Sequence, residues 1–351
     1  MKYSIIVPVF NRPDEVDELL ESLSNQTQKD FEVIIVEDGS VKTCKDVCDK
    51  YADILALHYY AKENSGPGQS RNYGAERANG EWLLILDSDV VLPTGYLEAI
   101  DHSLTSDIVA FGGPDAAHPS FTPVQKAISY SMTSFFTTGG IRGSSPQSGG
   151  TRGALDKFYP RSFNMGIRRD VYLQLGGFSK MRFGEDIDFS YRIVEAGHSP
   201  RLFPEAWVWH KRRTDFKKFF RQVYNSGIAR INLEKRHPGT MKLVHLLPTV
   251  FTVGVIALIL ISAVGRALMH YVDRDQFYWM CFAPWIPILL YSLLICIDST
   301  IKNKSLKVGL LSIPAAFVQL MGYGLGFIES WWKRCVQKQD EFQAFEKTFY
   351  K

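Results

Sequence analysis

The sequence has few cysteines and almost no excess of charge of either sign. Its 351 residues hold five cysteines, of which only Cys44 and Cys48 are close together. This excludes a disulfide framework, and with no second pair nearby it disfavours a zinc site. The net charge is only +3, so we expect no nucleic-acid partner. With 46% hydrophobic and 22% charged residues, the chain is typical of a folded protein.

The N-terminal MKYSIIVPVF lacks a basic segment and a cleavage site, so we interpret it as a first strand rather than a signal peptide. Long apolar runs appear only after residue 240, at 243–265, 277–297 and 308–328. Each is near the ~20 residues that a spanning helix needs. A buried helical core is the alternative, but these runs contain few charges. We therefore expect transmembrane helices in residues 241–330, followed by a polar tail over 331–351.

Lysine and arginine set the expected orientation of this region. Residues 211–242 contain ten of them against two acids, and such an excess marks the cytoplasmic side of a membrane. We therefore expect an inner-membrane, multi-pass protein whose globular part faces the cytoplasm. Three spans would place the basic tail on the opposite side, so the sequence leaves open whether the third run spans.

Residues 1–212 alternate between buried strands and amphipathic helices. This alternation predicts an α/β domain with a mostly parallel, doubly wound sheet. In such sheets ligands bind outside the carboxyl ends of the strands. The expected strands are 3–11, 31–40, 55–60 and 82–86, and the expected helices are 13–26, 42–51 and 69–78.

Four polar residues follow these strands, namely Asn11, Asp38, Asp87 and Asp89. Each alone could be a turn residue or a helix cap, but four at matching positions favour one shared site. Two carboxylates two residues apart can hold Mg²⁺ or Mn²⁺, and such an ion also binds diphosphate oxygens. The pattern therefore predicts a nucleoside diphosphate at this edge of the sheet.

The segment NSGPGQSRNYG does not fit a dinucleotide-binding motif. After Gly66 and Gly68 the third glycine of that motif would fall at position 71, where Arg71 stands. Arg71 lies near the start of its helix, where a guanidinium can bind phosphate, so we predict a nucleotide or phosphate contact for it.

A second acidic group, Glu185, Asp186 and Asp188, leads into a later helix. Acids in a first helical turn can simply stabilise the helix dipole, which suits Asp188 in part. A carboxylate facing the donor could instead accept the proton of an attacking hydroxyl. We assign this role to Asp186, with Glu185 as its neighbour and alternative.

Taken together, VPVFN, VEDGS, NSGPGQSRNYG, LDSD, NMGIRRDVYLQLGGF and GEDIDFSYRIVEAG resemble, in order and spacing, the family 2 glycosyltransferases of the GT-A fold. The resemblance covers about residues 1–215. It implies a UDP-, GDP- or dTDP-sugar donor, a bound Mn²⁺ or Mg²⁺, and inversion at the anomeric carbon.

The resemblance also implies roles for individual residues. Pro8 and Asp38 would contact the nucleotide base, with Asn11 beside them. Asp87 would lie on the ribose or sugar side, and Asp89 would bind the metal directly. His210 closes a later strand and would be a further metal or diphosphate contact, although a capped surface histidine is the alternative.

Departures from related enzymes narrow the predicted function. Processive synthases carry QxxRW where this chain has FRQVYNSGIAR, which disfavours a polymerase. We predict an inverting hexosyltransferase that extends a membrane-held or lipid-linked saccharide in cell-surface polysaccharide synthesis. A polyprenyl-phosphate glycosyltransferase is the main alternative, and a non-catalytic nucleotide-sugar-binding scaffold is the second. A homo-oligomer is compatible with the sequence.

Two further segments are predicted to lie near the acceptor substrate. Residues 213–240 place aromatic residues at helical spacing among cations, which indicates an interfacial helix on an anionic membrane; a solvated charged face is the alternative. A Gly/Ser-rich loop with Arg142 and Arg152 could close over the substrates, and a plain surface loop is equally compatible with it.

Overall fold

The computed structural model describes residues 1–118, 120–138, 158–267 and 274–346. These residues form two compact units, each described here by itself. Residues 1–118, 158–211 and 345–346 form the first, which we call the sheet unit, and residues 120–138, 212–267 and 274–344 form the second, the helical unit. The sequence predicted residues 1–212 as one domain. The chain changes units between Lys211 and Arg212, and residues 120–138 belong to the helical unit; the predicted domain bounds stay a prediction.

The sheet unit is built on a seven-stranded sheet of order β3-β2-β1-β4-β8-β6-β9. The neighbours β3, β2, β1 and β4 are parallel, whereas β8 is antiparallel to both β4 and β6. The predicted, mostly parallel sheet is therefore confirmed. The strands are β1 (Tyr3–Val9), β2 (Phe31–Asp38), β3 (Leu57–Lys62), β4 (Trp82–Leu86), β6 (Ala110–Gly112), β8 (Asn164–Arg168) and β9 (Arg201–Leu202).

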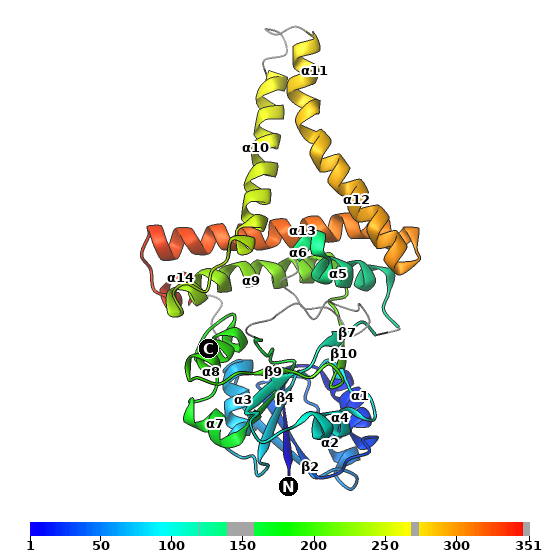
Figure 1. Ribbon diagram of the computed structural model, residues 1–351, viewed down its shortest axis with the longest axis vertical. Helices are drawn as coiled ribbons and strands as arrows, with labels where there is room; N and C mark the ends of the chain where they lie inside the picture. The colour runs from blue at the N-terminus through cyan, green and yellow to red at the C-terminus, as the bar shows by residue number, and fades with distance from the viewer. Residues whose placement is uncertain (119, 139–157, 268–273, 347–351) are drawn as a thin grey trace. The chain divides into compact units, whose positions relative to one another are not determined.

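Helices cover both faces of this sheet (Figure 1). Successive strand residues point to opposite faces, so in β1 Ile5 and Val7 join one buried cluster and Ile6 joins the other. The first cluster includes α1 (Pro13–Ser24), α2 (Lys45–Tyr51) and α4 (Tyr96–Ser103), and the second includes α3 (Pro67–Ala75), α7 (Arg169–Gln174) and α8 (Glu185–Glu195).

A second, three-stranded sheet positions one predicted site residue. It pairs β10 (Val208–His210) with β5 (Val90–Val91) and β7 (Asp115–Ala116). His210 pairs with Val90, the residue after Asp89. The small sheet therefore brings His210 to the carboxyl end of β4.

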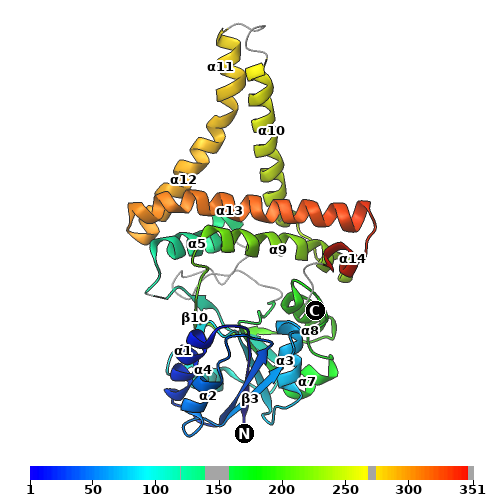
Figure 2. The same cartoon turned by 180° about the vertical axis from the view of Figure 1, so that it is seen from behind.

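The helical unit contains three segments that are long and apolar enough to cross a membrane, Leu243–Ala267, Ala283–Asn303 and Leu306–Val336. Within it, α13 lies side by side with α9 and runs across α10 and α12 (Figures 1 and 2). Its helices are α5 (Pro123–Thr133), α6 (Phe135–Thr138), α9 (Phe216–Arg236), α10 (Leu247–Ala267), α11 (Arg274–Phe282), α12 (Ile286–Asn303) and α13 (Leu306–Trp331), with short turns η2 (Leu243–His245), η3 (Ala283–Trp285) and η4 (Trp332–Val336). A last short helix, α14 (Glu341–Phe345), follows them.

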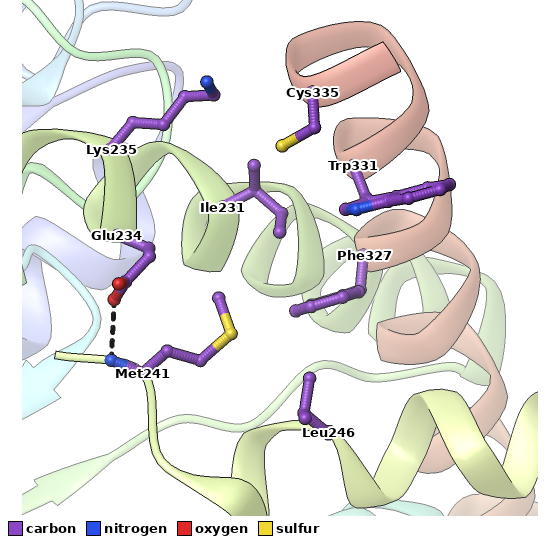
Figure 3. Close-up of a pocket in the computed structure, with 8 residues that line it drawn as sticks. All are labelled: Ile231, Glu234, Lys235, Met241, Leu246, Phe327, Trp331 and Cys335. Atoms are coloured by element: carbon purple, nitrogen blue, oxygen red, sulfur yellow. Dashed lines mark hydrogen bonds between the residues drawn. The ribbon is translucent and has the colours of Figure 1, made fainter. Parts of the chain in front are cut away.

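A mainly apolar pocket of about 320 Å³ lies within the helical unit (Figure 3). It is bounded by α9, by α13 with η4, and by the segment that leads into α10. Glu234 and Lys235 are its charged members, and the Glu234 carboxylate accepts a hydrogen bond from the backbone N–H of Met241. Its other lining residues are Ile231, Met241, Leu246, Phe327, Trp331 and Cys335.

Candidate active site

Asn11 forms hydrogen bonds between the segments that follow β1 and β2. Its backbone is left-handed, with φ of 56°, a conformation that asparagine tolerates better than most residues. Its side-chain carbonyl accepts hydrogen bonds from the backbone N–H groups of Val41 at 2.8 Å and Lys42 at 2.9 Å. Asn11 therefore connects the loop after β1 to the loop after β2, and the residues predicted to contact the nucleotide base lie at these strand ends.

Asp38, at the end of β2, holds the loop that precedes α3. Its carboxylate accepts from the backbone N–H groups of Ser65 at 2.9 Å and Gly66 at 2.8 Å, and it pairs with Lys62. Asp38 is buried, and these donors fix its orientation. Pro8 is half-buried in β1.

Asp87, Asp89 and His210 form a compact cluster after β4. Each offers one ligand atom, and these three atoms lie within 4.8 Å of one another. The Oδ1 atom of Asp89 is 3.3 Å from Nε2 of His210. Two carboxylates and an imidazole form a donor set that Mn²⁺ accepts, whereas Mg²⁺ prefers oxygen ligands alone. The three predicted metal ligands are thus brought together, and their chemistry fits a divalent ion.

Asp89 is also paired with Arg12, a residue that the sequence reasoning missed. Nη1 of Arg12 is 2.5 Å from Oδ2 of Asp89, whose side chain is only 10% exposed. Burial alone would raise the pKa of Asp89, but His210 and Arg12 outweigh it and hold that pKa well below its usual range. Arg12 directly follows Asn11, so its place after a strand was the available signal.

Arg71 joins the two acidic groups that the sequence predicted to converge. Its guanidinium Nη2 lies 2.7 Å from Oδ1 of Asp87, and Nη1 lies 3.4 Å from Oε1 of Glu185. The Arg71 side chain is 4% exposed and packs against the ring of Phe178. One buried cation therefore connects the strand-end carboxylates to the start of α8.

The pKa values of Glu185 and Asp186 are shifted in opposite directions from their usual values. Burial raises the pKa of Glu185 despite the opposing charge of Arg71. For Asp186 the burial effect is outweighed by Arg161, whose Nε lies 2.8 Å from Oδ2, so its pKa is lowered. Neighbouring carboxylates with separated pKa values are a common arrangement at acid–base sites. Of the two carboxylates, Asp186 is the one whose pKa is lowered, which favours its ionised form.

The remaining sequence-predicted residues fall into two groups. Asp188 is buried and accepts hydrogen bonds from Ser179 at 2.8 Å and Arg192 at 3.1 Å, which agrees with a structural contribution at the helix start. Arg142 and Arg152 lie outside the described residues. Arg161 was missed because it precedes β8 in an irregular segment, where no periodic pattern marks it.

Comparison with known proteins finds similarity mainly in the N-terminal half of the chain. Residues 4–170 match the family model described as glycosyl transferase family 2. Over these residues the chain resembles the family 2 glycosyltransferases. An uncharacterized glycosyltransferase from Haemophilus influenzae is 31% identical over 199 residues, which are 55% of this chain and 62% of that protein. The pre-mycofactocin glycosyltransferase of Mycobacterium tuberculosis is 26% identical over 286 residues, 76% of this chain and 53% of that protein.

The fold of this chain also resembles that of a solved structure. The mannosyltransferase PcManGT from Pyrobaculum calidifontis, in complex with GDP-Man and Mn²⁺, superposes with a TM-score of 0.60 at 14% identity. The match covers 95% of this chain and 88% of that one. The predicted GT-A fold is therefore confirmed. The curated relatives are longer than the matched region, which spans 13% of a Rickettsia bellii glycosyltransferase and 53% of the mycobacterial protein.

Proposed function

We propose that this protein is an inverting, metal-dependent glycosyltransferase that moves a sugar from a nucleoside-diphosphate sugar to an acceptor held at a membrane. The observation that carries the proposal is the Arg71 bridge, because it sets the strand-end carboxylates and the α8 carboxylates on two sides of one guanidinium. Donor binding and proton acceptance can therefore take place at one site.

Asp87, Asp89 and His210 would hold the metal, which we infer to be Mn²⁺ from the mixed oxygen and nitrogen donor set. When bound, such an ion stabilises the charge of a departing diphosphate as a Lewis acid. PcManGT, which shares the fold, was solved with GDP-Man and Mn²⁺. Arg12 and His210 keep Asp89 ionised and therefore ready to coordinate.

Asp186 is the proposed general base. The acceptor oxygen bonds to the anomeric carbon from the face opposite the diphosphate, the bond from that carbon to the diphosphate oxygen breaks, and the hydroxyl proton passes to Asp186. A base must be unprotonated before the reaction, and Arg161 keeps Asp186 in that form. Glu185, whose pKa is raised, is less suited to the role.

Pro8, Asn11 and Asp38 are proposed to contact the nucleotide base, as the family resemblance implies. Arg71 was predicted to contact phosphate. Its guanidinium is already paired with two carboxylates, so the contacts favour a different role. We therefore assign it to positioning Asp87 and Glu185.

The acceptor is proposed to be lipid-linked. The helical unit supplies apolar segments that could cross a membrane and the cationic helix α9. These features would keep the enzyme where lipid-linked saccharides are extended, on the cytoplasmic face of the inner membrane. A role in surface polysaccharide synthesis follows from this placement.

A donor screen tests the proposal. Membranes containing the full chain would be incubated with radiolabelled UDP-, GDP- or dTDP-sugars, and the extracted lipids analysed by mass spectrometry. We expect one donor to label lipid-linked saccharide in a Mn²⁺-dependent way, and the Asp186→Asn chain to give no label. Efficient labelling of bare polyprenyl phosphate would favour the alternative acceptor. Metal-dependent nucleotide binding with neither transfer nor donor hydrolysis would favour a scaffold.

A further inference from the structure

Helix α13 differs from the other apolar segments in what surrounds it. Its segment, Leu306–Val336, has the same mean hydropathy of 1.6 as Ala283–Asn303, so composition does not separate them. However, 50% of its most apolar window is buried inside the structure, against 17% for Ala283–Asn303 and 11% for Leu243–Ala267. Half of this window of α13 is therefore covered by protein and does not face lipid.

The partner that covers much of α13 is α9, and the two backbones touch. A Cβ added to Gly227 of α9 would lie 2.1 Å from the carbonyl oxygen of Tyr323. A Cβ added to Gly326 of α13 would lie 2.0 Å from the carbonyl oxygen of Tyr224. Small residues permit this approach from both sides, so the two helices pack as one rigid pair.

The contact between α9 and α13 extends to the C-terminal part of α9. The Ser330 hydroxyl donates to the carbonyl oxygen of Ile228 at 3.2 Å, and Nε of Arg334 donates to Oδ1 of Asn232 at 2.7 Å. Towards its other end, α13 packs on α5 through Ala127, Val308 and Ala315. Protein therefore lies beside α13 over nearly its whole length.

Helix α9 is unsuited to crossing a membrane. Its charged residues are distributed from its first turn to its last, and burying them in hydrocarbon is unfavourable. With its apolar face on α13 and its charges elsewhere, it fits the bilayer interface. The charged residues of α9 are Lys217, Lys218, Arg221, Arg230, Glu234, Lys235 and Arg236.

We propose that α13 lies in the plane of the membrane interface beside α9, and that within the described residues only α10 and the α11–α12 segment cross the membrane. Since the two helices run side by side (Figures 1 and 2), the depth of α9 fixes the depth of α13. Lys304, in a left-handed conformation with φ of 50°, and Ser305 make the turn between α12 and α13.

This topology places the tail on the same side as the sheet unit. Only four residues separate Lys211 from the start of α9 at Phe216, and α9 does not cross. Two crossings then return the chain to that side, so the basic residues Lys333 and Arg334 join the cationic segment before α10. This topology collects these lysines and arginines on one side of the membrane, which is the distribution expected for the cytoplasmic side.

The pocket of Figure 3 fits the same placement. It opens between α9 and α13 and is lined mainly by apolar side chains, with Lys235 among its charged members. An apolar hollow exposed to water is unfavourable, whereas lipid chains can fill one at the interface.

Cysteine accessibility in membranes of known orientation tests the topology without reference to activity. Wild-type Cys335 is exposed although it also lines the pocket, Cys296 is partly buried, and Cys44, Cys48 and Cys281 are buried. Inside-out vesicles and intact spheroplasts would be treated with a membrane-impermeant maleimide, and Cys335→Ser controls for labelling elsewhere. In the Cys335→Ser background, Val41→Cys reports the sheet unit and Asp275→Cys reports the start of α11, because both positions are exposed.

We expect Cys335 and the cysteine at position 41 to label from the same side, and the cysteine at position 275 to label from the opposite side. Labelling in detergent first establishes that each thiol is reactive. If Cys335 labels from the same side as position 275, α13 spans and the proposal fails. If all three label from one side, no segment crosses and the proposal also fails.

Discussion

The sheet unit and the helical unit hold their parts together by different means. In the sheet unit the site carboxylates are each paired with a cation, as in Arg12 with Asp89 at 2.5 Å and Arg161 with Asp186 at 2.8 Å. In the helical unit α9 and α13 approach each other at glycine, since a Cβ added to Gly326 would lie 2.0 Å from the carbonyl oxygen of Tyr224. The first arrangement is sensitive to changes of charge, and the second to changes of volume.

The largest expected effect is on catalysis. Asp186→Asn keeps the shape of the side chain but removes proton acceptance, so turnover should fall by about 10²- to 10⁴-fold while donor binding is retained. Single-turnover kinetics and donor titration measure the two quantities separately. Glu185→Gln is the matched control and should be less damaging. If Glu185→Gln abolishes turnover and Asp186→Asn does not, the base is Glu185.

Arg71→Met tests how strongly the sheet unit depends on charge pairing. The substitution leaves Asp87 and Glu185 without their shared cation, and removing one partner of a buried pair costs about 3–5 kcal/mol of unfolding free energy. Urea unfolding followed by tryptophan fluorescence gives this number. Arg77→Met, on a partly exposed arginine that follows the same helix, should cost less than about 1 kcal/mol. Equal losses for the two variants would contradict the argument.

Gly326→Val tests the helical unit in the same way. The added side chain would overlap the backbone of Tyr224, so we expect a loss of about 1–3 kcal/mol and a lower melting temperature in detergent. Gly254→Val, in α10, is the control because nothing lies within 4 Å of its added Cβ. Melting temperatures that do not differ would mean that the α9–α13 contact is not rigid.

The smallest expected effect is on pH dependence. Arg161 lowers the pKa of Asp186, so the ionised base persists as the pH falls. Arg161→Gln should raise that pKa and move the acid limb of the kcat/KM profile to higher pH, by about one unit or less because Arg161 is partly exposed. An unchanged acid limb would show that another group controls it. Activity at the alkaline end should change little.

Much of the sheet unit could be predicted because its signals are local. The alternation of strands and helices predicted the parallel core, and the residues that follow each strand predicted Asn11, Asp38, Asp87 and Asp89. The position of β8 between β4 and β6 could not be predicted, because its pairing joins segments far apart in the chain. Arg12 and Arg161 were missed for a related reason, since an ion pair between loops leaves no periodic pattern.

The helical unit shows a different limit of sequence analysis. Hydropathy and length identified three apolar runs, and the described part of the chain has three helical segments of this kind. These quantities do not distinguish a helix that faces lipid from one that faces protein, because both are apolar. The distinguishing signal in α13 is its small residues Gly322, Gly324 and Gly326. The first and third contact α9, and the second contacts α10.

These glycines have a consequence for how the chain is made. Since α9 precedes α13 in the sequence, α9 is synthesised first and is available when α13 emerges from the ribosome. Helix α13 is apolar enough to enter the bilayer by itself, so the proposed interfacial position requires that α13 docks to α9 before insertion is complete. A bulky residue at Gly326 should therefore do more than lower stability, because it would divert part of the newly made chains into a three-span form.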